Sequence, residues 1–285
     1  MTITPPLVWI SSYPKSGNTW VRNFLYRYLW GEPRVNIGKR SLAIDRIVRE
    51  SGADGARESL MAAHAEAVHS VWPPEISEHL LVKTHYEWSP AHPVADDGRM
   101  TLLIVRDPRD VMLSAMNFRE MRSRSNASSA HEYVESFIAT LGDPGYFKRG
   151  YGTWLSHPLS WISQSTTDSP VAVVGYRSLL EEPVETFAAV TRSIFGSLDE
   201  SRLEVAIEGS SFRNLREREI ERKEKRGETT DKLFFNSGTA GRTIHDTTGV
   251  VGLDHEFDAV FGAQVEQLRE AIDANPTVLD LGTKL

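Results

Sequence analysis

The chain has 285 residues, of which 40% are hydrophobic and 25% are charged, the composition of an ordinary globular protein that buries a substantial core. Its 32 Lys and Arg residues against 39 Asp and Glu residues give a formal net charge of -7, so the surface as a whole repels polyanions and we expect no nucleic-acid partner. The chain has no cysteine, which excludes disulfides, thiolate metal sites and a cysteine nucleophile.

The amino-terminal sequence MTITPPLVWISSYPK lacks the basic region and long apolar core of a secretory signal. No later apolar run approaches the roughly 18 residues that a membrane-spanning helix needs. We therefore expect a cytoplasmic protein that has no membrane partner.

Four short aliphatic runs predict buried β-strands. Each run is too short for a stable helix, and its apolar residues suit burial on both faces of a sheet. The runs are Leu7–Ser11, Leu80–Lys83, Met100–Val105 and Val171–Gly175.

Segments of helical period lie between these strands. Apolar residues from Trp20 to Leu29 recur at the spacing that lines one face of a helix. Pro108 suits the first position of a helix that runs to about Met121, and residues 183–195 also have a helical pattern. The alternation predicts an α/β fold, a doubly wound, P-loop-like parallel sheet flanked by helices on both faces. No repeat or compositional break marks a second domain, so we expect a single domain over residues 1–285.

Two segments lack a regular pattern. Residues 122–130 are rich in serine, and residues 225–252 are rich in Gly, Thr and charged side chains. The second segment is long enough to form a flexible, functional flap.

The strongest motif is Ser12-Tyr13-Pro14-Lys15-Ser16-Gly17-Asn18-Thr19-Trp20, between a predicted strand and a predicted helix. A strand, a tight loop and a helix N-terminus direct several backbone N–H groups at one point, which suits an anion. Lys15 adds a cation, and Gly17 permits close approach of the backbone. Further side-chain donors come from Ser16, Asn18 and Thr19. The motif therefore predicts a phosphate or sulfate site.

This loop is not a Walker A sequence, because Lys15 precedes Gly17 whereas the Walker lysine follows the second glycine. The string YPKSGNTW closely resembles the 5'-phosphosulfate loop of the cytosolic-type sulfotransferases, commonly YPKSGTTW, with Asn18 as the one visible change. The resemblance implies that the loop, through Trp20, binds the donor 3'-phosphoadenosine-5'-phosphosulfate. The alternative is a strand-to-helix turn with a solvated lysine.

A second anion site is predicted where the strand Met100–Val105 ends. Ligands of open α/β sheets gather beyond the carboxyl ends of the strands, and Arg106 stands at such an end with a guanidinium suited to phosphate. In the sulfotransferases the corresponding arginine and a serine eight positions later bind the 3'-phosphate. Arg106 and Ser114 have the same spacing, so the resemblance implies the same role for them. Alternatively, Arg106 binds local carbonyls or pairs with Asp110, and Ser114 is a small residue at a helix contact.

The run Lys83-Thr84-His85 follows another strand and resembles the KTH segment of the same family. The resemblance implies that His85 is the general base, and histidine titrates near neutrality, as such a base requires. Lys15 is then expected to stabilise the bridging oxygen as it leaves, and Lys83 to assist at the sulfuryl oxygens. Glu87 is the reserve base.

Two later segments resemble the adenine contacts of the family. Tyr176 follows the strand Val171–Gly175 in the place of a tyrosine that packs near adenine. Ser211 and Phe212 resemble a small hydroxyl residue and an aromatic residue that flank the base. As alternatives, Tyr176 closes the edge of the sheet and Phe212 belongs to the core.

The C-terminal signature of the family, approximately RKGxxGDW, is altered in this chain. The best match, Asn236-Ser237-Gly238-Thr239-Ala240-Gly241-Arg242, keeps both glycines and loses the two cations. The resemblance assigns Gly238 to the 3'-phosphate, and either Arg242 or Arg226 is expected to supply the missing charge.

Together these motifs predict a sulfotransferase that moves a sulfuryl group to a hydroxyl of a small or medium-sized acceptor, without a metal. The main alternative is a P-loop kinase that uses ATP and Mg²⁺, although Arg106 stands where such an enzyme needs an acid. A further alternative is an inactive nucleotide-binding scaffold.

The resemblance is strong over residues 8–29 and 80–118 and moderate over 171–212. Residues of about 31–79 and 117–161 match no part of the family pattern, so we expect them to shape the acceptor pocket. The sequence leaves the acceptor open, and it leaves open whether the protein is a monomer or a homodimer.

Overall fold

The computed structural model describes residues 6–31, 42–71, 79–92, 94–122, 129–236 and 238–285. The start of the amino-terminal segment, parts of the two predicted acceptor segments, and Ser237 of the predicted C-terminal signature lie outside the described residues.

A six-stranded, wholly parallel sheet forms the centre of the molecule, with the strand order β2-β3-β1-β4-β5-β6. The α/β fold and all four predicted strands are confirmed, and two short edge strands are additional. The strands are β1 (Leu7–Ser12), β2 (Leu42–Ala43), β3 (Leu80–Thr84), β4 (Gly98–Val105), β5 (Val171–Gly175) and β6 (Val278–Asp280).

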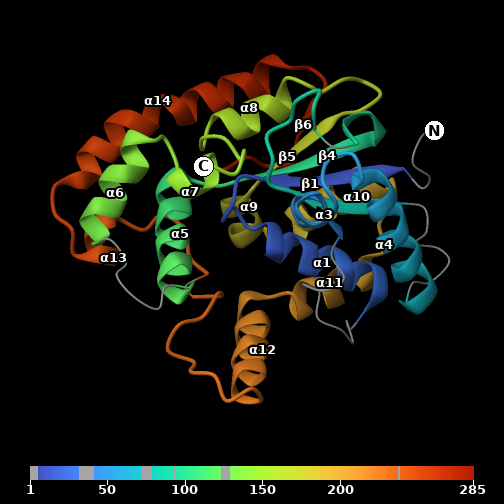
Figure 1. The fold of residues 1–285 in the computed structure, drawn as a ribbon, viewed down its shortest axis with the longest axis horizontal. Coiled ribbons are helices and arrows are strands. Elements are labelled where there is room, and N and C mark those ends of the chain that lie inside the picture. Colours follow the sequence, from blue (N-terminus) through green and yellow to red (C-terminus); the bar gives the residue numbers. More distant parts are fainter. Residues whose placement is uncertain (1–5, 32–41, 72–78, 93, 123–128, 237) are drawn as a thin grey trace.

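Helices cover both faces of this sheet (Figure 1). One face packs against α6 (Ala130–Ala139), α8 (Ser156–Ile162) and α14 (Leu253–Ala274). The other packs against α1 (Asn18–Trp30), α10 (Pro183–Phe195) and α11 (Glu200–Gly209). The remaining helices are α3 (Ile44–Ser51), α4 (Ala56–Val71), α5 (Pro108–Arg122), α7 (Pro144–Phe147), α9 (Tyr176–Glu181), α12 (Phe212–Glu224), α13 (Ile244–Thr248) and the 3-10 helix Ala95–Asp97.

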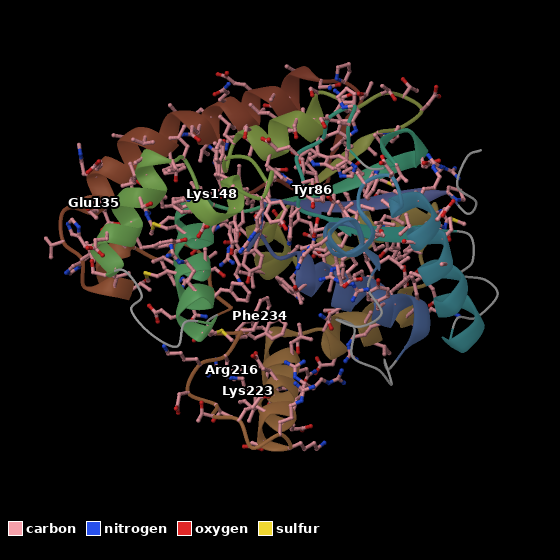
Figure 2. The ribbon with its side chains drawn as sticks, in the orientation of Figure 1. Tyr86, Glu135, Lys148, Arg216, Lys223 and Phe234 are labelled. Atoms are coloured by element: carbon pink, nitrogen blue, oxygen red, sulfur yellow. The ribbon has the colours of Figure 1, made fainter. Side chains whose placement is uncertain are left out.

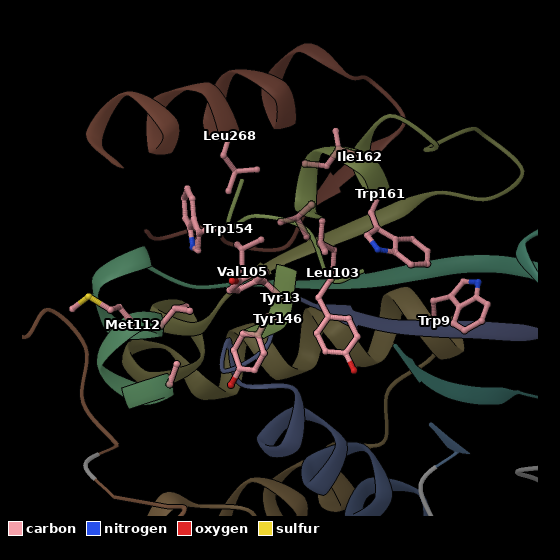
Figure 3. Close-up of a cluster of buried hydrophobic side chains, with 14 of the residues drawn as sticks. Trp9, Tyr13, Leu103, Val105, Met112, Tyr146, Trp154, Trp161, Ile162 and Leu268 are labelled. Atoms are coloured by element: carbon pink, nitrogen blue, oxygen red, sulfur yellow. The ribbon is translucent and has the colours of Figure 1, made fainter. Parts of the chain in front are cut away.

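Two cores result because successive strand residues point to opposite faces of the sheet. Leu103 and Val105 of β4 belong to the core under α8 and α14, whereas Leu102 and Ile104 belong to the core under α1 and α10. Figure 3 shows Trp161 of α8 and Leu268 of α14 on the side of the first core. Burial on both faces explains why the strands read as continuous apolar runs.

The order of the strands reverses at β1, which lies between β3 and β4. After β1 the chain runs to the edge strand β2, returns to β3, and then passes to the other side of β1 as β4. Such a reversal opens a crevice at the carboxyl ends of the strands, where ligands bind in open α/β sheets. Among the described helices, none is long and apolar enough to cross a membrane.

Candidate active site

A cavity of about 810 Å³ lies at the carboxyl ends of the central strands. The residues that directly follow β3, β4 and β5 all line it, as does the loop after β1. The predicted site residues among its walls are Lys15, Gly17, Asn18, Thr19, Trp20, His85, Arg106, Ser114, Tyr176, Phe212, Gly238 and Arg242.

The loop after β1 has an unusual backbone that brings it close to the cavity wall. Gly17 has φ 109°, and a Cβ atom at this position would lie 2.7 Å from Cδ2 of Tyr176, so only glycine fits. Lys15 also has a left-handed conformation, with φ 74°, which strains a residue that carries a side chain. α1 begins immediately after Gly17, so the unpaired N–H groups of its first turn lie at the cavity.

Asn18, the departure from the family loop, uses its side chain inside the protein. Its Nδ2 donates to the carbonyl of Ile10 (3.0 Å) and to Oγ of Ser12 (3.3 Å), and its Oδ1 accepts from Nε of Arg22 (2.8 Å). The amide therefore ties the end of β1 to the first turn of α1.

The ammonium group of Lys15 lies between two aromatic rings. Its Nζ is 4.4 Å from the ring centroid of Phe118 and 4.1 Å from that of Phe234, both within cation–π range. Phe234 lies between α12 and the sheet (Figure 2), and the buried carboxylate of Glu219 accepts from its backbone N–H at 2.7 Å. The segment that follows α12 thus packs against Lys15 in the loop after β1.

Arg106 is almost fully buried and joins three parts of the cavity. Its Nη1 donates to the carbonyl of Lys15 and its Nη2 to the carbonyl of Thr239, both at 3.2 Å, while its guanidinium carbon lies 3.9 Å from the ring centroid of Tyr176. Burial lowers the pKa of Arg106 below its usual value. The predicted contact with local carbonyls is present, and it coexists with a position on the cavity wall.

Asp110 pairs with Arg242 rather than with Arg106. Its Oδ1 lies 3.4 Å from Nε of Arg242, and its Oδ2 accepts from the backbone N–H of Gly241 at 3.0 Å. Arg242 lines the cavity, whereas Arg226 is exposed and lies 3.9 Å from Glu228. Of the two cations that the sequence offered for the altered signature, the structure therefore brings Arg242 to the site.

Three aromatic side chains line the cavity beside the predicted anion sites: Trp20, Tyr176 and Phe212. The rings of Trp20 and Tyr176 meet edge to face with centroids 5.5 Å apart. A Cβ atom on Gly238, which has φ 62°, would lie 2.5 Å from the ring of Phe212, so this glycine covers the ring closely. Such a cluster suits the faces of a planar base.

His85 is held in one tautomer by the end of β1. Its Nδ1 lies 2.7 Å from the carbonyl oxygen of Ser12, which can only accept, so Nδ1 carries the proton and Nε2 keeps its lone pair. Burial, and then the charge of Lys83, lower the pKa of His85 to about 3. The imidazole is therefore neutral near physiological pH.

Asp45, which sequence reasoning missed, lies behind this histidine. Its Oδ1 accepts from the backbone N–H of His85 at 2.8 Å, and its Oδ2 pairs with Nζ of Lys83. Lys83 does not line the cavity. Its ammonium is engaged by a buried carboxylate, so the assistance at the sulfuryl oxygens that the resemblance implies for Lys83 stays a prediction.

Two further predicted contacts, Ser16 and Ser211, and the reserve base Glu87 do not line the cavity. Ser16 of the loop is buried. Ser211 is the N-cap of α12, where its Oγ accepts from the N–H of Asn214 at 3.3 Å. Glu87 packs against Gly152, where a Cβ atom would lie 2.0 Å from its Oε1. His85 is thus the candidate base that the fold brings to the cavity.

A further group of cavity residues, gathered around Tyr151, was indicated by no motif. They are Asp45, Arg49, Tyr86, Tyr146, Arg149 and Tyr151. Of the aromatic residues in the predicted acceptor segment, Tyr146 reaches the cavity, whereas Tyr133, Phe137 and Trp154 are core residues. The cavity thus combines an anion-binding type of loop, several arginines and an aromatic cluster.

Comparison with known proteins names the family. The model of the sulfotransferase domain family matches residues 5–269, so the chain belongs to this family, as the loop motif predicted. Sulfotransferase 1A1 of Canis lupus familiaris is 24% identical over 264 residues, which cover 90% of this chain and 82% of that protein. Sulfotransferase 1B1 of Mus musculus is 24% identical over 217 residues, which cover 75% and 67%.

Solved structures share the fold. Mouse sulfotransferase SULT7A1, complexed with PAP, has a TM-score of 0.63 at 18% identity and covers 95% of this chain and 91% of its own. Retinol dehydratase, in complex with androsterone and inactive cofactor PAP, has a TM-score of 0.59 at 18% identity, over 100% of this chain and 83% of its own. These similarities confirm the predicted architecture over nearly the whole chain.

Proposed function

We propose that this enzyme transfers a sulfuryl group from 3'-phosphoadenosine-5'-phosphosulfate (PAPS) to a hydroxyl group of a small or medium-sized acceptor. The acceptor oxygen forms a bond to sulfur, the bond between sulfur and the bridging 5'-phosphate oxygen breaks, and the acceptor proton passes to an enzyme base. The products are a sulfate ester and adenosine 3',5'-bisphosphate (PAP).

The single observation that carries this proposal is that the Lys15 loop, Arg106 and His85 line one cavity. The loop and the first turn of α1 bind the 5'-phosphosulfate, and Lys15 neutralises the negative charge that grows on the bridging oxygen. At the other anion site, Arg106, Ser114 and Arg242 bind the 3'-phosphate. The aromatic cluster of Trp20, Tyr176 and Phe212 packs against the adenine.

His85 takes the proton of the attacking hydroxyl. Its Nδ1 proton is committed to Ser12, so Nε2 is the nitrogen that accepts. The low pKa of His85 in the unliganded enzyme keeps Nε2 unprotonated. The negative charge of a bound donor raises the pKa of His85, which makes the imidazole a stronger base.

The kinase alternative is less well supported because of the residue at the end of β4. Phosphoryl transfer from ATP needs Mg²⁺, which P-loop enzymes hold through a hydroxyl of the loop and an acidic residue at a strand end. Here that strand end carries Arg106, whose cation repels a divalent metal.

A transfer assay with mass-spectrometric detection tests the proposal. The protein is incubated with PAPS and extracts or panels of hydroxyl compounds, and products are searched for a gain of one sulfuryl group with release of an equal amount of PAP. A parallel reaction contains ATP and Mg²⁺. A sulfated product supports the proposal; a phosphorylated product would replace it with the kinase, and tight PAP binding without any product would replace it with the scaffold.

A further inference from the structure

The part of the cavity wall around Tyr151 is cationic and aromatic, although the chain as a whole is acidic. Arg49 and Arg149 line this part together with Tyr86, Tyr146 and Tyr151. The ring of Tyr151 links the group to the base, because its centroid lies 5.7 Å from that of His85 and 5.5 Å from that of Tyr86. An acceptor that presents its hydroxyl to His85 therefore extends along these tyrosines.

Each arginine is carried by an element that the fold holds in place. Arg49 lies one helical turn after Asp45 on α3, and the side chain of Asp45 is fixed by Lys83 and by the backbone of His85. Arg149 follows α7, whose N-cap Asp143 accepts from the hydroxyl of Tyr133 at 2.8 Å. The positions of both arginines thus depend on buried polar contacts.

Neither guanidinium is neutralised by an acid in the described part of the chain. Arg49 donates to the backbone carbonyl of Asp45 at 3.3 Å, and the one acid on this wall, Asp45, is already paired with Lys83. Burial, and then Asp45 and Tyr86, raise the pKa of Tyr151 to about 12. The charges of Arg149 and Arg49 oppose that rise, so both arginines act on the same tyrosine. Two cations therefore face one acceptor space.

An exposed arginine is usually solvated and has no further role. Two arginines on one cavity wall, Arg49 and Arg149, therefore call for a physical explanation. Under the proposed function the donor shares the cavity and is strongly anionic, so it repels a second anion. Lys15, Arg106 and Arg242 line the same cavity and are the cations that the proposed function assigns to the donor. Arg49 and Arg149 offset that repulsion when the acceptor carries a negative charge. A neutral alcohol is not repelled by the donor and needs no such cations.

Resting on the proposed function, we propose that the acceptor is a hydroxylated ring compound that bears an anionic group, and that Arg49 and Arg149 bind this anion while the tyrosines pack against the ring. A carboxylate suits the planar guanidinium fork of either arginine. The site selects against cationic acceptors by charge repulsion.

The test compares matched acceptors that differ in charge: para-hydroxyphenylacetate, its neutral amide, and the cationic amine tyramine, with the propionate and butyrate homologues to vary the reach. Binding of each compound is measured by calorimetry to the enzyme saturated with PAP, which requires no sulfuryl transfer. Sulfation is measured separately with PAPS. Wild-type enzyme is expected to bind at least one acid about fivefold or more tightly than its amide, and the amine least.

Variants then locate the anion site. Arg49→Gln and Arg149→Gln are each expected to weaken binding of the acid about fivefold while changing the amide and PAP less than twofold. The matched controls are Arg46→Gln on the same helix and Lys148→Gln beside Arg149, because neither residue lines the cavity.

The possible failures are distinguishable. Equal binding of acid, amide and amine would overturn the acidic acceptor, as would arginine variants that weaken PAP as strongly as the acid, since the cations would then serve the donor. A preference for the acid without sulfation by PAPS would instead overturn the proposed function and leave the anion site standing.

Discussion

The guanidinium of Arg106 donates a hydrogen bond to the backbone carbonyl of Lys15, at 3.2 Å. Arg106 follows β4 and Lys15 follows β1, and these strands are neighbours in the sheet. The same contact helps to hold the strained backbone of Lys15. Under the proposed function, the residues that bind the 3'-phosphate and those that bind the 5'-phosphosulfate are therefore physically joined.

Replacing His85 with alanine tests the base. We expect kcat to fall about 100-fold to 10 000-fold, because the attacking hydroxyl loses its proton acceptor, while the Kd for PAP changes less than threefold. The assay is steady-state sulfation combined with calorimetric PAP binding. His245→Ala is the matched control, since its side chain is 60% exposed. Undiminished turnover in His85→Ala would reject the histidine as base.

The stability of the protein should depend on two buried histidines. The pKa of His85 and that of His157 are each lowered to about 3 by burial, whereas both titrate near 6.5 in the unfolded chain. The unfolded state therefore binds more protons below pH 6.5, and the free energy of unfolding falls by about 1.4 kcal/mol per pH unit for each histidine as the pH drops from about 6.5 toward 3.

Denaturant unfolding between pH 7 and pH 4 measures this slope, and imidazole NMR signals measure the two pKa values. The variant His157→Asn removes one titrating group and should lose about half of the dependence above pH 5, where carboxylates contribute little. A histidine signal from either residue that titrates near 6.5 in the folded protein would contradict the prediction.

Asp45 should position the base rather than merely stabilise the fold. Asp45→Leu removes the oxygen that accepts the backbone N–H of His85, so the base loses a contact that places it, and we expect kcat to fall about tenfold with PAP affinity unchanged. The thermal midpoint should fall as well, because Lys83 is left as a buried unpaired cation. The double variant Asp45→Leu/Lys83→Met removes that cation and should recover most of the thermal midpoint but not kcat. Recovery of both would assign Asp45 a structural role only.

Gly17 should be needed for donor binding. Gly17→Ala places a Cβ atom 2.7 Å from the ring of Tyr176, which must then move in the wall that is proposed to bind adenine, so we expect PAP affinity to fall tenfold or more. Gly52→Ala is the matched control, because Gly52 also has a positive φ, 74°, with no atom within 4 Å of the added Cβ. It should cost about 1 kcal/mol of stability and leave PAP affinity unchanged. Equal loss of affinity in both variants would contradict the prediction.

The sequence predicted the elements that pack most regularly. The four central strands are buried on both faces and read as aliphatic runs, and the loop at Lys15 is contiguous, so both were recognisable. The edge strands β2 and β6 have two and three residues and carry no pattern of their own. Their existence depends on pairing with neighbours.

The residues missed at the site are those brought there by tertiary structure. Asp45 lies 40 positions from His85 in the chain, and its carboxylate is recognisable as a partner only when α3 is placed beside β3. The same carboxylate explains why Lys83 is not at the cavity. The sequence could not decide whether Arg226 or Arg242 supplies the missing cation. That decision depended on Asp110, which pairs with Arg242 and is buried at the start of α5, and no motif indicates this burial.

The most direct test is a calorimetric comparison of PAP with adenosine 5'-monophosphate, which lacks the 3'-phosphate. Wild-type enzyme should bind PAP about 10-fold to 100-fold more tightly, since hydrogen bonds to charged groups are each worth about 1.5–3 kcal/mol. Ser114→Ala should reduce this preference, Arg106→Ala should abolish it, and Lys15→Ala should weaken both nucleotides alike. Equal affinity of the wild-type enzyme for the two nucleotides would contradict a single cavity that reads both phosphates.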